Sequence, residues 1–435
     1  MDLAQVVAEE LEAARRRSLD LLAPLADADL ERQISPIMSP LVWDLAHVGN
    51  YEELWLLRAA LGAAPIDPSL DPIYDAFRHP RKNRPQLPLL GPGAARRYIA
   101  DVRGRVLDSL GRVRFDGAGA PPLLKDGFVH GMVIQHEHQH DETMLATLQL
   151  LGEGGHRPLR AAPTPAAPAT APLPAEVLVP AGEFVLGTDD EPWAYDNEGP
   201  AHLVDLADFW IDSTPVTNRA YLGFVEDGGY AERPWWDDEG WEWRTAEAVD
   251  CPQFWRREGP GAWSRVRFGW REELPLDEPV QHVCWHEAAA YARWAGKRLP
   301  TEAEWEKAAS WGPDGVKRRF PWGDAAPTAG LANLDGACWG PAPVGAYPAG
   351  ASAWGLHQLV GDVWEWTSSD FEAYPGFESF PYREYSEVFF GGGYKVLRGG
   401  SWATSATAVR NTFRNWDLSI RRQIFAGFRC ARDAS

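Results

Sequence analysis

The sequence predicts two domains of different class, an N-terminal α-helical bundle over residues 1–153 and a C-terminal α+β domain over residues 177–435. The first part is rich in Leu, Ala, Arg and Glu, and its apolar residues recur with the 3.6-residue period of a helix. Residues 154–176 form a linker rich in proline and alanine that offers few core-forming side chains. Of the 22 tryptophans, only Trp43 and Trp55 precede this linker. The aromatic, glycine-rich remainder is typical of an irregular α+β domain.

The apolar periodicity of the N-terminal domain predicts four helices, near residues 2–24, 40–61, 93–112 and 125–151. Four helices of that length indicate a bundle, and bundles commonly bind metals between facing helices. Gly62 is a typical stop signal for the second helix. In the C-terminal domain the pattern predicts helices over residues 286–295 and 301–310. Thr301 and Glu304 form a capping box at the start of the latter.

The segment QHEHQHDE at residues 135–142 carries the strongest functional signal in the chain. His136 and His140 are four residues apart, so on a helix they lie one turn apart on the same face. Two imidazoles placed in this way can converge on one divalent metal ion. They share the stripe that should turn inward, whereas His138 points elsewhere. The alternative is a solvated, charge-rich helix that contains three histidines without binding a metal.

A third ligand has to come from another helix, and His47 is the best candidate. It shares one helical stripe with Trp43 and Leu54, which predicts that its side chain turns inward. A lone histidine on an apolar face is more often a hydrogen-bonded core residue than a ligand, and that alternative stays open here. His130 and His79 are weaker candidates for the same role.

The charge balance limits the partners that the protein can have. The net charge is −20, with 62 acidic against 42 basic residues, which argues against nucleic acid and anionic membranes. No apolar run is long enough for a transmembrane helix, and residues 1–24 do not resemble a signal peptide. We therefore expect a cytoplasmic protein, and we expect a monomer. The four cysteines are widely spaced, which favours reduced thiols over disulfides or a zinc site.

Six motifs of the C-terminal domain resemble those of the formylglycine-generating-enzyme type of domain, which has a C-type-lectin-like fold. In chain order they are VPAGEF at 179–184, RLPTEAEWE at 298–306, FPWG at 320–323, GDVWEW at 361–366, RGGSW at 398–402 and GFRCA at 427–431. The oxidases of that family use a pair of cysteines near the C-terminus, but the matching stretch here, residues 401–423, has none. The resemblance therefore implies that this domain supplies a pocket and not copper–thiolate chemistry.

The N-terminal domain resembles the DinB-like four-helix metal-binding bundle through a His-x3-His-x-Glu motif made of His136, His140 and Glu142. Together the two domains are similar to one group, the iron-dependent sulfoxide synthases of ergothioneine and ovothiol biosynthesis. Three segments favour the ergothioneine branch, because they resemble its two ligand helices and its C-terminal substrate loop. They are LVWDLAH at 41–47, HEHQHDETML at 136–145 and NWDLSIRRQIF at 415–425.

The resemblance implies an oxygenase that uses O2 to join a thiol sulfur to C2 of the imidazole of hercynine (N-α-trimethylhistidine). The sulfur is oxidised to a sulfoxide in the same reaction. The implied cofactor is Fe(II), bound by His47, His136 and His140. Three histidines leave three positions of an octahedral ion for the substrate imidazole, the thiolate and O2. Because all three ligands are neutral, we expect the site to favour an anionic thiolate.

The resemblance also assigns roles to residues that contact hercynine. Tyr382 is implied as the catalytic acid, and Tyr385 as a residue that lines the hercynine site. Gln139 is implied as a contact to the imidazole or the carboxylate. Asn415 and Trp416 are implied partners of the trimethylammonium group, to which the tryptophan offers a cation–π face. Without the resemblance, both tyrosines would be interpreted as packing residues of an aromatic-rich domain.

γ-Glutamylcysteine is the thiol co-substrate that the resemblance implies. Arg81 and Arg84 match a pair of arginines that binds its carboxylates. Asp417 and Arg421 match residues that bind its α-ammonium group and a carboxylate, and arginine binds carboxylates through two parallel hydrogen bonds. The alternative for the first pair is a solvated basic loop. The sequence also leaves open whether Arg421 or the adjacent Arg422 faces the pocket.

Two other kinds of function stay open at this point. One is a related sulfoxide synthase that uses cysteine or makes an ovothiol-type product. The other is a DinB-like zinc or nickel thiol transferase, or a lectin-like binding module. The tryptophan-rich domain would suit sugar binding, but a binding module would not need a three-histidine site in a separate bundle.

Overall fold

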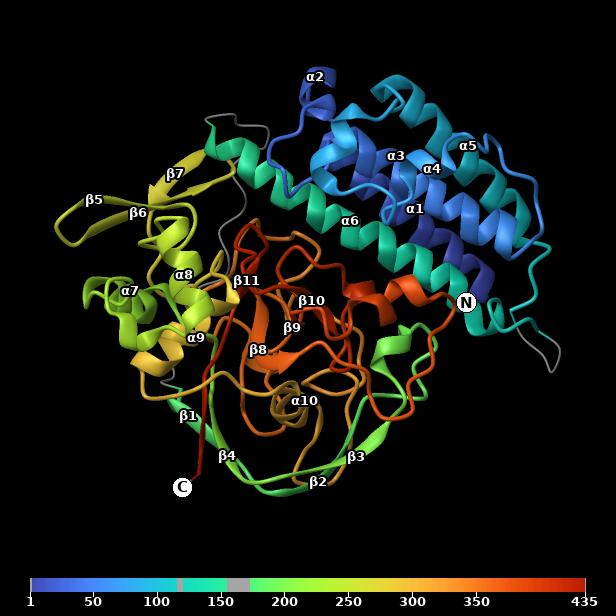
Figure 1. The fold of residues 1–435 in the computed structure, drawn as a ribbon. Coiled ribbons are helices and arrows are strands. Elements are labelled where there is room, and N and C mark those ends of the chain that lie inside the picture. Colours follow the sequence, from blue (N-terminus) through green and yellow to red (C-terminus); the bar gives the residue numbers. More distant parts are fainter. Residues whose placement is uncertain (1, 116–119, 155–172, 435) are drawn as a thin grey trace. The chain divides into compact units, whose positions relative to one another are not determined.

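The structure is a computed structural model that describes residues 2–115, 120–154 and 173–434. Within these ranges the chain forms two compact units, one helical and one with mixed helices and strands (Figure 1). The predicted linker falls largely outside the described residues. The segment Asp190–Tyr195 packs with the helical unit although it follows the linker in sequence, which the composition did not indicate.

The helical unit is built on four long helices that run alongside one another (Figure 1). Their bounds are α1 Leu3–Leu22, α3 Leu41–Glu52, α5 Pro92–Leu110 and α6 Phe128–Glu153. Helix α3 packs against α5 and α6, and α1 packs against α6 and α5. The predicted four-helix bundle is therefore confirmed, with ends that differ from the sequence estimates by a few residues, apart from α3.

Shorter helical segments complete this unit. They are α2 Asp27–Glu31, the π-helix η1 Glu53–Ala59, α4 Asp71–Tyr74, and the 3₁₀ helices η2 Arg81–Gln86 and η3 Lys125–Gly127. Helix α3 ends earlier than predicted because the chain continues into the wider turns of η1, and Gly62 then ends the helix with a φ of +70°. The change of pitch rotates Leu54 outward, where it is 38% exposed. The prediction of an inward-facing Leu54 was wrong for this reason.

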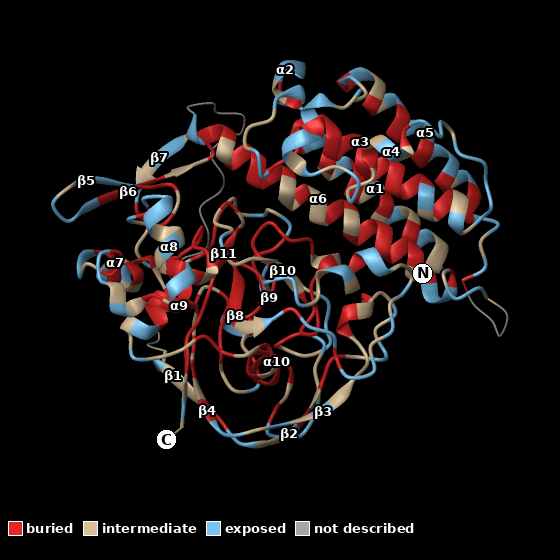
Figure 2. Ribbon diagram, in the orientation of Figure 1, coloured by how far each residue is buried: buried red, intermediate tan, exposed pale blue. Residues whose placement is uncertain are grey.

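Helix α6 is not a solvated helix, because it is buried on more than one side (Figure 2). Its Glu137 lies in a buried ion-pair network with Arg15 (2.7 Å) and Arg103 (3.0 Å), and both arginines also pair with Glu52. Burial opposes ionisation of Glu137, but the two arginines hold its pKa at about 2. Removing one member of such a network typically costs about 3–5 kcal/mol. The network therefore fixes the rotation of α6 about its axis.

The second unit is built around several small sheets with helices between them. Its strands are β1 Glu176–Val179, β2 Gly182–Leu186, β3 His202–Leu206, β4 Phe209–Asp212, β5 Trp255–Gly259, β6 Ala262–Arg267, β7 Trp270–Glu273, β8 Trp364–Asp370, β9 Tyr394–Arg398, β10 Asn415–Leu418, β11 Ala426–Gly427 and β12 Ala431–Asp433. The described strands pair in the orders β10-β9-β8-β11, β1-β4-β12, β5-β6-β7 and β2-β3. Strand β10 pairs antiparallel with β9, and β11 is parallel to β8.

The helices of the second unit are short. They are α7 Asn218–Glu226, α8 Asp238–Ala246, α9 Trp285–Trp294 and α10 Glu302–Ser310, with 3₁₀ helices at η4 Asp196–Glu198, η5 Arg233–Trp235, η6 Pro348–Gly350, η7 Arg383–Tyr385, η8 Glu387–Phe389 and η9 Ala406–Ala408. Both predicted helices are present as α9 and α10. The capping box of α10 is confirmed, since the Glu304 backbone N–H donates to Thr301 Oγ1 (3.1 Å) and the Thr301 N–H donates to Glu304 Oε2 (2.7 Å).

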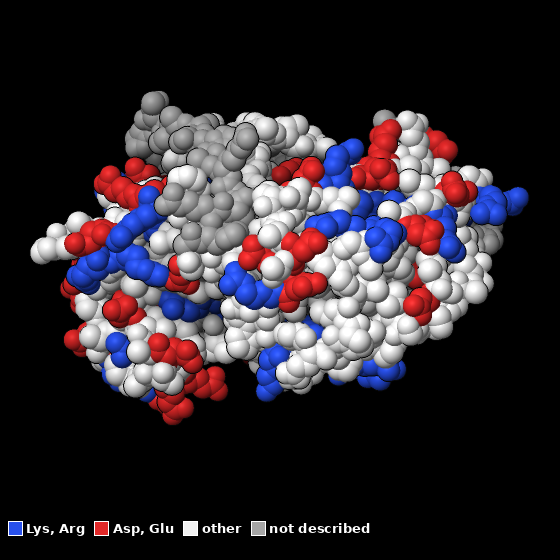
Figure 3. Space-filling model, turned by 90° about the horizontal axis from the view of Figure 1, so that it is seen from above, with Lys and Arg blue, Asp and Glu red and all other residues white. Residues whose placement is uncertain are grey.

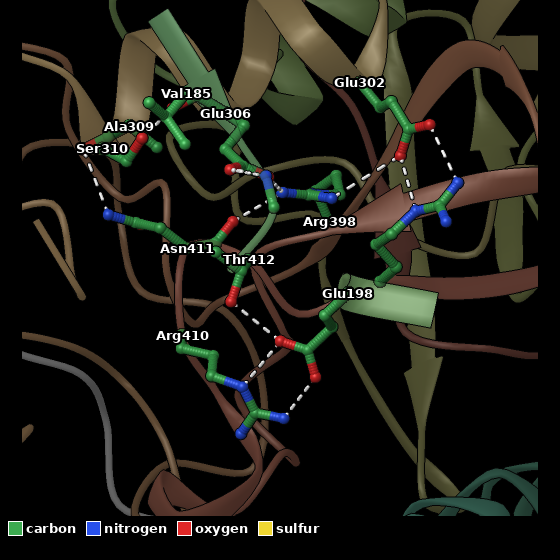
Figure 4. A network of polar contacts seen from close by, with 12 residues as sticks. Val185, Glu198, Glu302, Glu306, Ala309, Ser310, Arg398, Arg410, Asn411 and Thr412 are labelled. Carbon is green, nitrogen blue, oxygen red and sulfur yellow. Dashed lines mark hydrogen bonds and ion pairs between the residues drawn. The ribbon is translucent and has the colours of Figure 1, made fainter. Parts of the chain in front are cut away.

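Buried arginine–glutamate pairs hold the core of the second unit together (Figure 4). Arg410 donates from Nε to Glu198 at 2.7 Å, and Arg414 donates two hydrogen bonds to Glu302 at 2.9 Å each. Both arginines are at most 2% exposed. Because a buried charge without its partner is strongly unfavourable, these pairs fix the segment that leads directly into β10.

The surface carries both signs of charge. On the face shown in Figure 3, lysine and arginine side chains lie beside aspartate and glutamate side chains. Among the residues that the structure describes, no helix combines the length and the apolar character needed to span a bilayer. The four cysteines form no disulfide, and Cys284 and Cys430 are buried.

Candidate functional site

Three histidines converge in the helical unit. His47 comes from α3, and His136 and His140 come from successive turns of α6. One ring nitrogen of each histidine lies within 4.8 Å of one ring nitrogen of the other two, a spacing that fits coordination of a shared metal ion. In the described part of the chain, this is the only group of three or more histidine, cysteine or carboxylate side chains placed in this way.

Two of the three imidazoles are held in the orientation that metal binding requires. His47 Nδ1 lies 2.7 Å from the carbonyl oxygen of Tyr74, which can only accept, so Nδ1 carries the proton. His140 Nδ1 lies 3.1 Å from Asp44 Oδ1 and donates to that carboxylate in the same way. Both rings therefore keep Nε2 for a metal, as ligand histidines with a hydrogen-bonded second nitrogen do.

The third imidazole is oriented by stacking. The ring of His136 lies 3.7 Å from the ring of Tyr51, and the two planes differ by 14°. Its Nδ1 is buried and has no hydrogen-bond partner among the described residues. Burial, together with the nearby imidazoles, keeps the pKa of His47 and of His136 well below the usual histidine value. Both rings are therefore neutral, the protonation state that binds metals.

The buried side chain of Arg84 packs against Trp43, the residue of α3 that stacks on His47. Trp43 stacks on His47 at 4.5 Å between ring centroids, and the guanidinium of Arg84 lies 3.5 Å above the Trp43 ring. Arg84 also donates to Ser39 Oγ (2.6 Å) and to the carbonyl oxygen of His79 (3.2 Å), and burial lowers its pKa to about 10. Arg84 therefore helps to orient His47, and its predicted role as a carboxylate ligand stays a prediction.

The other predicted residues of the helical unit are Arg81 and Gln139. Arg81 lies on the same 3₁₀ helix as Arg84 and donates to the Ile37 carbonyl at 3.1 Å. Gln139, next to His140 on α6, accepts a hydrogen bond from the Tyr195 hydroxyl at 3.4 Å. Tyr195 belongs to the segment that returns to this unit from beyond the linker.

That returning segment is fitted closely to α6. The backbone carbonyl of Trp193 accepts a hydrogen bond from Gln135 Nε2 at 2.9 Å. A Cβ atom at Gly131 would lie 2.3 Å from the Trp193 ring, so only glycine leaves room for the tryptophan there. The two alternative ligands are elsewhere: His130 packs edge-on against Phe115, and His79 Nε2 bonds the Pro72 carbonyl. Neither joins the three-histidine cluster.

The second unit gathers the predicted aromatic residues into one cluster. Trp416 on β10 stacks on Phe371 at 4.2 Å, and the ring of Tyr385 meets Trp416 edge-on at 5.8 Å. Tyr382 lies 6.2 Å from Tyr385 in a similar edge-on arrangement. The turn that carries both tyrosines is held in place by hydrogen bonds at Ser386. Its Oγ accepts a hydrogen bond from the side-chain amide of Asn197 at 3.0 Å and donates one to the Asp196 carboxylate.

The predicted polar residues of the second unit lie on β10 and on the loop that follows it. Asn415 and Asp417 share one face of β10 because side chains alternate along a strand, and Trp416 lies on the other face. Arg421 approaches Asp417, with 3.3 Å between Nε and Oδ1. Arg422 instead pairs with the buried Glu287 at 2.8 Å. Arg421 is therefore the partner of Asp417 and Arg422 the partner of Glu287, and which of the two arginines faces the substrate stays a prediction.

Two family models cover most of the chain. Residues 161–434 match the Sulfatase-modifying factor enzyme 1-like domain, and residues 10–144 match the DinB superfamily. The chain is 54% identical to the hercynine oxygenase of Mycolicibacterium thermoresistibile, across 98% of this chain and 94% of that relative. It is 52% identical to the hercynine oxygenases of Mycolicibacterium smegmatis and Mycobacterium tuberculosis, across at least 99% of all three chains.

The chain belongs to the hercynine oxygenase family.

It is therefore an enzyme of the oxygenase class. The match to the DinB superfamily and to the sulfatase-modifying-factor type of domain confirms the fold class that the sequence predicted. In this member of the hercynine oxygenase family, the three-histidine cluster lies wholly within the helical unit.

Two residues that support the cluster were not predicted. Asp44 and Tyr51 lie three residues before and four residues after His47 on the same helix. This spacing places both on the face of His47 and could have identified them. Asp44 accepts from His140, and Tyr51 stacks on His136, so each connects α3 to a histidine of the cluster on α6.

Replacing Asp44 by alanine should weaken metal binding about 10–100-fold, the usual loss when the hydrogen-bond partner of a ligand histidine is removed. The reason is that His140 loses the acceptor that fixes its ring and its tautomer. Anaerobic titration with Fe(II) measures the effect. Asp101→Ala, on the exposed face of α5, is the control and should bind metal as the wild type does. Unchanged affinity in Asp44→Ala would show that packing alone orients His140.

Proposed function

We propose that the protein uses O2 and Fe(II) to join C2 of the hercynine imidazole to the sulfur of γ-glutamylcysteine, forming a sulfoxide in ergothioneine biosynthesis. The reaction breaks one C–H and one S–H bond and forms a C–S and an S–O bond. One oxygen atom of O2 enters the sulfoxide, and the other leaves as water with the two hydrogens. The observation that carries the proposal is the three-histidine cluster in a chain 54% identical to a hercynine oxygenase.

The residues of the cluster fit Fe(II). His47, His136 and His140 would hold the metal through neutral imidazole nitrogens and leave positions open for substrates. Bound there, Fe(II) would supply the redox chemistry that O2 activation requires. Because no carboxylate joins the ligand group, the positive charge of the metal is not offset by its ligands and favours the thiolate form of the co-substrate.

Hercynine carries a quaternary ammonium group that cannot donate a hydrogen bond. The face of Trp416 can attract such a cation, and its ring is fixed by stacking on Phe371. We assign Asn415 to the same group, Tyr385 to the lining of the hercynine site, and Gln139 to the imidazole or the carboxylate. These assignments rest on the family resemblance and on the edge-on contact between the rings of Tyr385 and Trp416.

γ-Glutamylcysteine presents two carboxylates and one ammonium group. We assign its carboxylates to Arg81, Arg84 and Arg421, and its ammonium group to Asp417. The 3.3 Å approach of Arg421 to Asp417 supports the last two assignments, because it places one cation and one anion together for a zwitterionic ligand. The cytoplasmic location and the monomeric state stay predictions.

An anaerobic single-turnover assay tests the proposed function. The protein is loaded with Fe(II), hercynine and γ-glutamylcysteine, O2 is admitted, and the products are identified by mass. The expected product is the sulfoxide that contains both substrates. Product formed faster from free cysteine would overturn the choice of thiol. Full activity of metal-free protein would overturn the metal-dependent mechanism, and no coupled product with either thiol would overturn the reaction.

Replacing Tyr382 by phenylalanine should change the product and not the binding of substrates. Phenylalanine keeps the ring that contacts Tyr385 and deletes the hydroxyl, the only proton donor of this side chain. We expect the variant to consume O2 while forming less sulfoxide and more sulfinic acid of the unjoined thiol. The measurement is the ratio of these two products at saturating substrates.

The matched control is Tyr385→Phe, which deletes a hydroxyl from the same turn. It should keep the product ratio of the wild type and change mainly the KM for hercynine. If Tyr382→Phe keeps both the ratio and the rate, Tyr382 is a packing residue, and a shifted ratio in Tyr385→Phe would make that tyrosine the acid.

A further inference from the structure

The loop after β10 is attached to α9 by both its backbone and one side chain. The Trp285 backbone N–H donates to the Ser419 carbonyl at 3.1 Å, and His282 Nδ1 lies 3.2 Å from the Arg422 carbonyl. The Arg422 guanidinium donates to both carboxylate oxygens of Glu287, at 2.8 and 2.9 Å. It also donates to the Cys251 carbonyl. Arg422 is therefore fixed in one orientation.

Glu287 is the centre of this attachment. It is fully buried and lies in the first turn of α9, where it accepts the Cys284 backbone N–H at 2.8 Å. The Tyr230 hydroxyl donates to its other oxygen at 2.5 Å. With the two bonds from Arg422, the carboxylate accepts four hydrogen bonds, which is close to its full capacity. A carboxylate bonded in this way cannot move without losing several contacts at once.

The adjacent residue has a different environment. Arg421 lies near Asp417, with 3.3 Å between Nε and Oδ1, and both side chains are partly exposed. The strand before them is fixed as well, because Arg414 is held by two hydrogen bonds to Glu302. The chain is thus held on both sides of Asp417 and Arg421. These two charged groups lie on the short stretch between the two attachments.

We propose that Glu287 and Arg422 are a positioning pair that sets Asp417 and Arg421 for the charged groups of the thiol co-substrate. The inference rests on the proposed function, since it gives that co-substrate an ammonium and a carboxylate group. Two parallel bonds between an arginine and a carboxylate fix direction as well as distance. A displacement of about 1 Å at a binding group is enough to weaken use of a substrate strongly. Neither Glu287 nor Arg422 has to touch the substrate for this.

Glu287→Gln tests the pair, because it keeps the size of the side chain and replaces one acceptor oxygen by a donor. We expect the KM for γ-glutamylcysteine to rise about tenfold, with the KM for hercynine and kcat at saturating thiol within about twofold of the wild type. A merely structural role would instead lower the active fraction, and with it kcat, for both substrates alike. Equal changes in both KM values, or none in either, would overturn the inference.

A double-mutant cycle shows whether the pair acts through Arg421. Groups that act on one interaction are not additive, whereas independent groups are. In an Arg421→Ala background only Asp417 is left to be positioned, so Glu287→Gln should raise the KM for γ-glutamylcysteine by clearly less than the increase of about tenfold expected without the Arg421 change. A full additional increase in the double variant would show that Glu287 acts by another route and would overturn the inference.

Glu365→Gln is the matched control. Glu365 is also fully buried, accepts two hydrogen bonds from one arginine (Arg429, 2.7 Å each) and one from a neutral ring donor (Trp305, 2.8 Å). Arg429, the partner of Glu365, lies between β11 and β12 and not in the loop after β10 that carries Arg421 and Arg422. We expect it to lower stability while leaving the ratio of the two KM values unchanged. If it raises that ratio as Glu287→Gln does, the effect is general destabilisation and the inference fails.

If the Glu287→Gln protein does not fold, Tyr230→Phe provides a milder test of the same pair. It removes one of the four donors to Glu287 and keeps the buried ion pair, so it should move the same KM in the same direction by a smaller factor. An unchanged KM in a folded Tyr230→Phe protein would then overturn the inference. If the wild type itself makes no coupled product from γ-glutamylcysteine, the proposed function fails first, and the positioning pair fails with it.

Discussion

Replacing His47 by alanine should abolish turnover and leave the protein folded. The loss should exceed the roughly 100-fold upper range for removing a supporting partner, because a ligand itself is lost. His47 lies beside His136 and His140, and its Nδ1 is already bonded to Tyr74. We expect about one Fe(II) per chain in the wild type and a stoichiometry near zero in the variant. Metal analysis after anaerobic loading and desalting gives this number, and circular dichroism reports the fold.

His130→Ala is the matched control for this experiment. His130 is a buried histidine of the same helix α6, packed against Phe115 and outside the three-histidine cluster. It should keep the metal stoichiometry of the wild type, whatever its stability. Full metal content and full activity in His47→Ala would remove His47 from the site and leave α6 with two ligands.

Replacing Asp417 or Arg421 by alanine should raise the KM for γ-glutamylcysteine by an amount equivalent to about 2–5 kcal/mol. Each variant removes one half of a charge pair whose atoms are 3.3 Å apart and leaves the charged group of the substrate unmatched. The KM for hercynine should change little, because no charged group of hercynine is assigned to either residue. Steady-state kinetics with each substrate varied in turn gives both constants.

Asp370→Ala is a suitable comparison for these variants. Asp370 ends β8 and pairs with Lys395, but it is largely exposed. Exposed pairs contribute about 0–1 kcal/mol, so both KM values should stay near those of the wild type. If Asp417→Ala affects hercynine as strongly as γ-glutamylcysteine, the assignment of Asp417 to the thiol co-substrate is wrong.

Helical spacing alone predicts that His136 and His140 share a face, and the structure confirms this. The same reasoning predicts an inward-facing His47, which is confirmed, and an inward-facing Leu54, which is wrong. The difference arises between the two residues, where α3 gives way to the π-helical turns of η1. A π-helix depends on how its neighbours pack, and no simple residue pattern marks its start.

The contacts that support the cluster were predicted less well than the meeting of the three histidines. Asp44 and Tyr51 have a helical spacing that points to them, but Tyr74 contributes only a backbone carbonyl, which no side-chain pattern reveals. The aromatic partners of Trp416 are Phe371, which directly follows β8, and residues of the turns around 385–389, so their contacts depend on the tertiary fold. Sequence patterns report periodicity within one element and say little about contacts between distant ones.

The return of Trp193 and Tyr195 to the bundle has a consequence for how the protein is made. A ribosome releases the four helices of the bundle well before it releases these two aromatic residues. Until then Gly131 on α6 lacks its contact with the Trp193 ring, and Gln135 lacks the Trp193 carbonyl as an acceptor. The bundle therefore cannot form all of its contacts until Asp190–Tyr195, which follows the linker in sequence, has been synthesised. A gene fragment cut at the end of α6 would code for all three histidines and still omit part of the bundle.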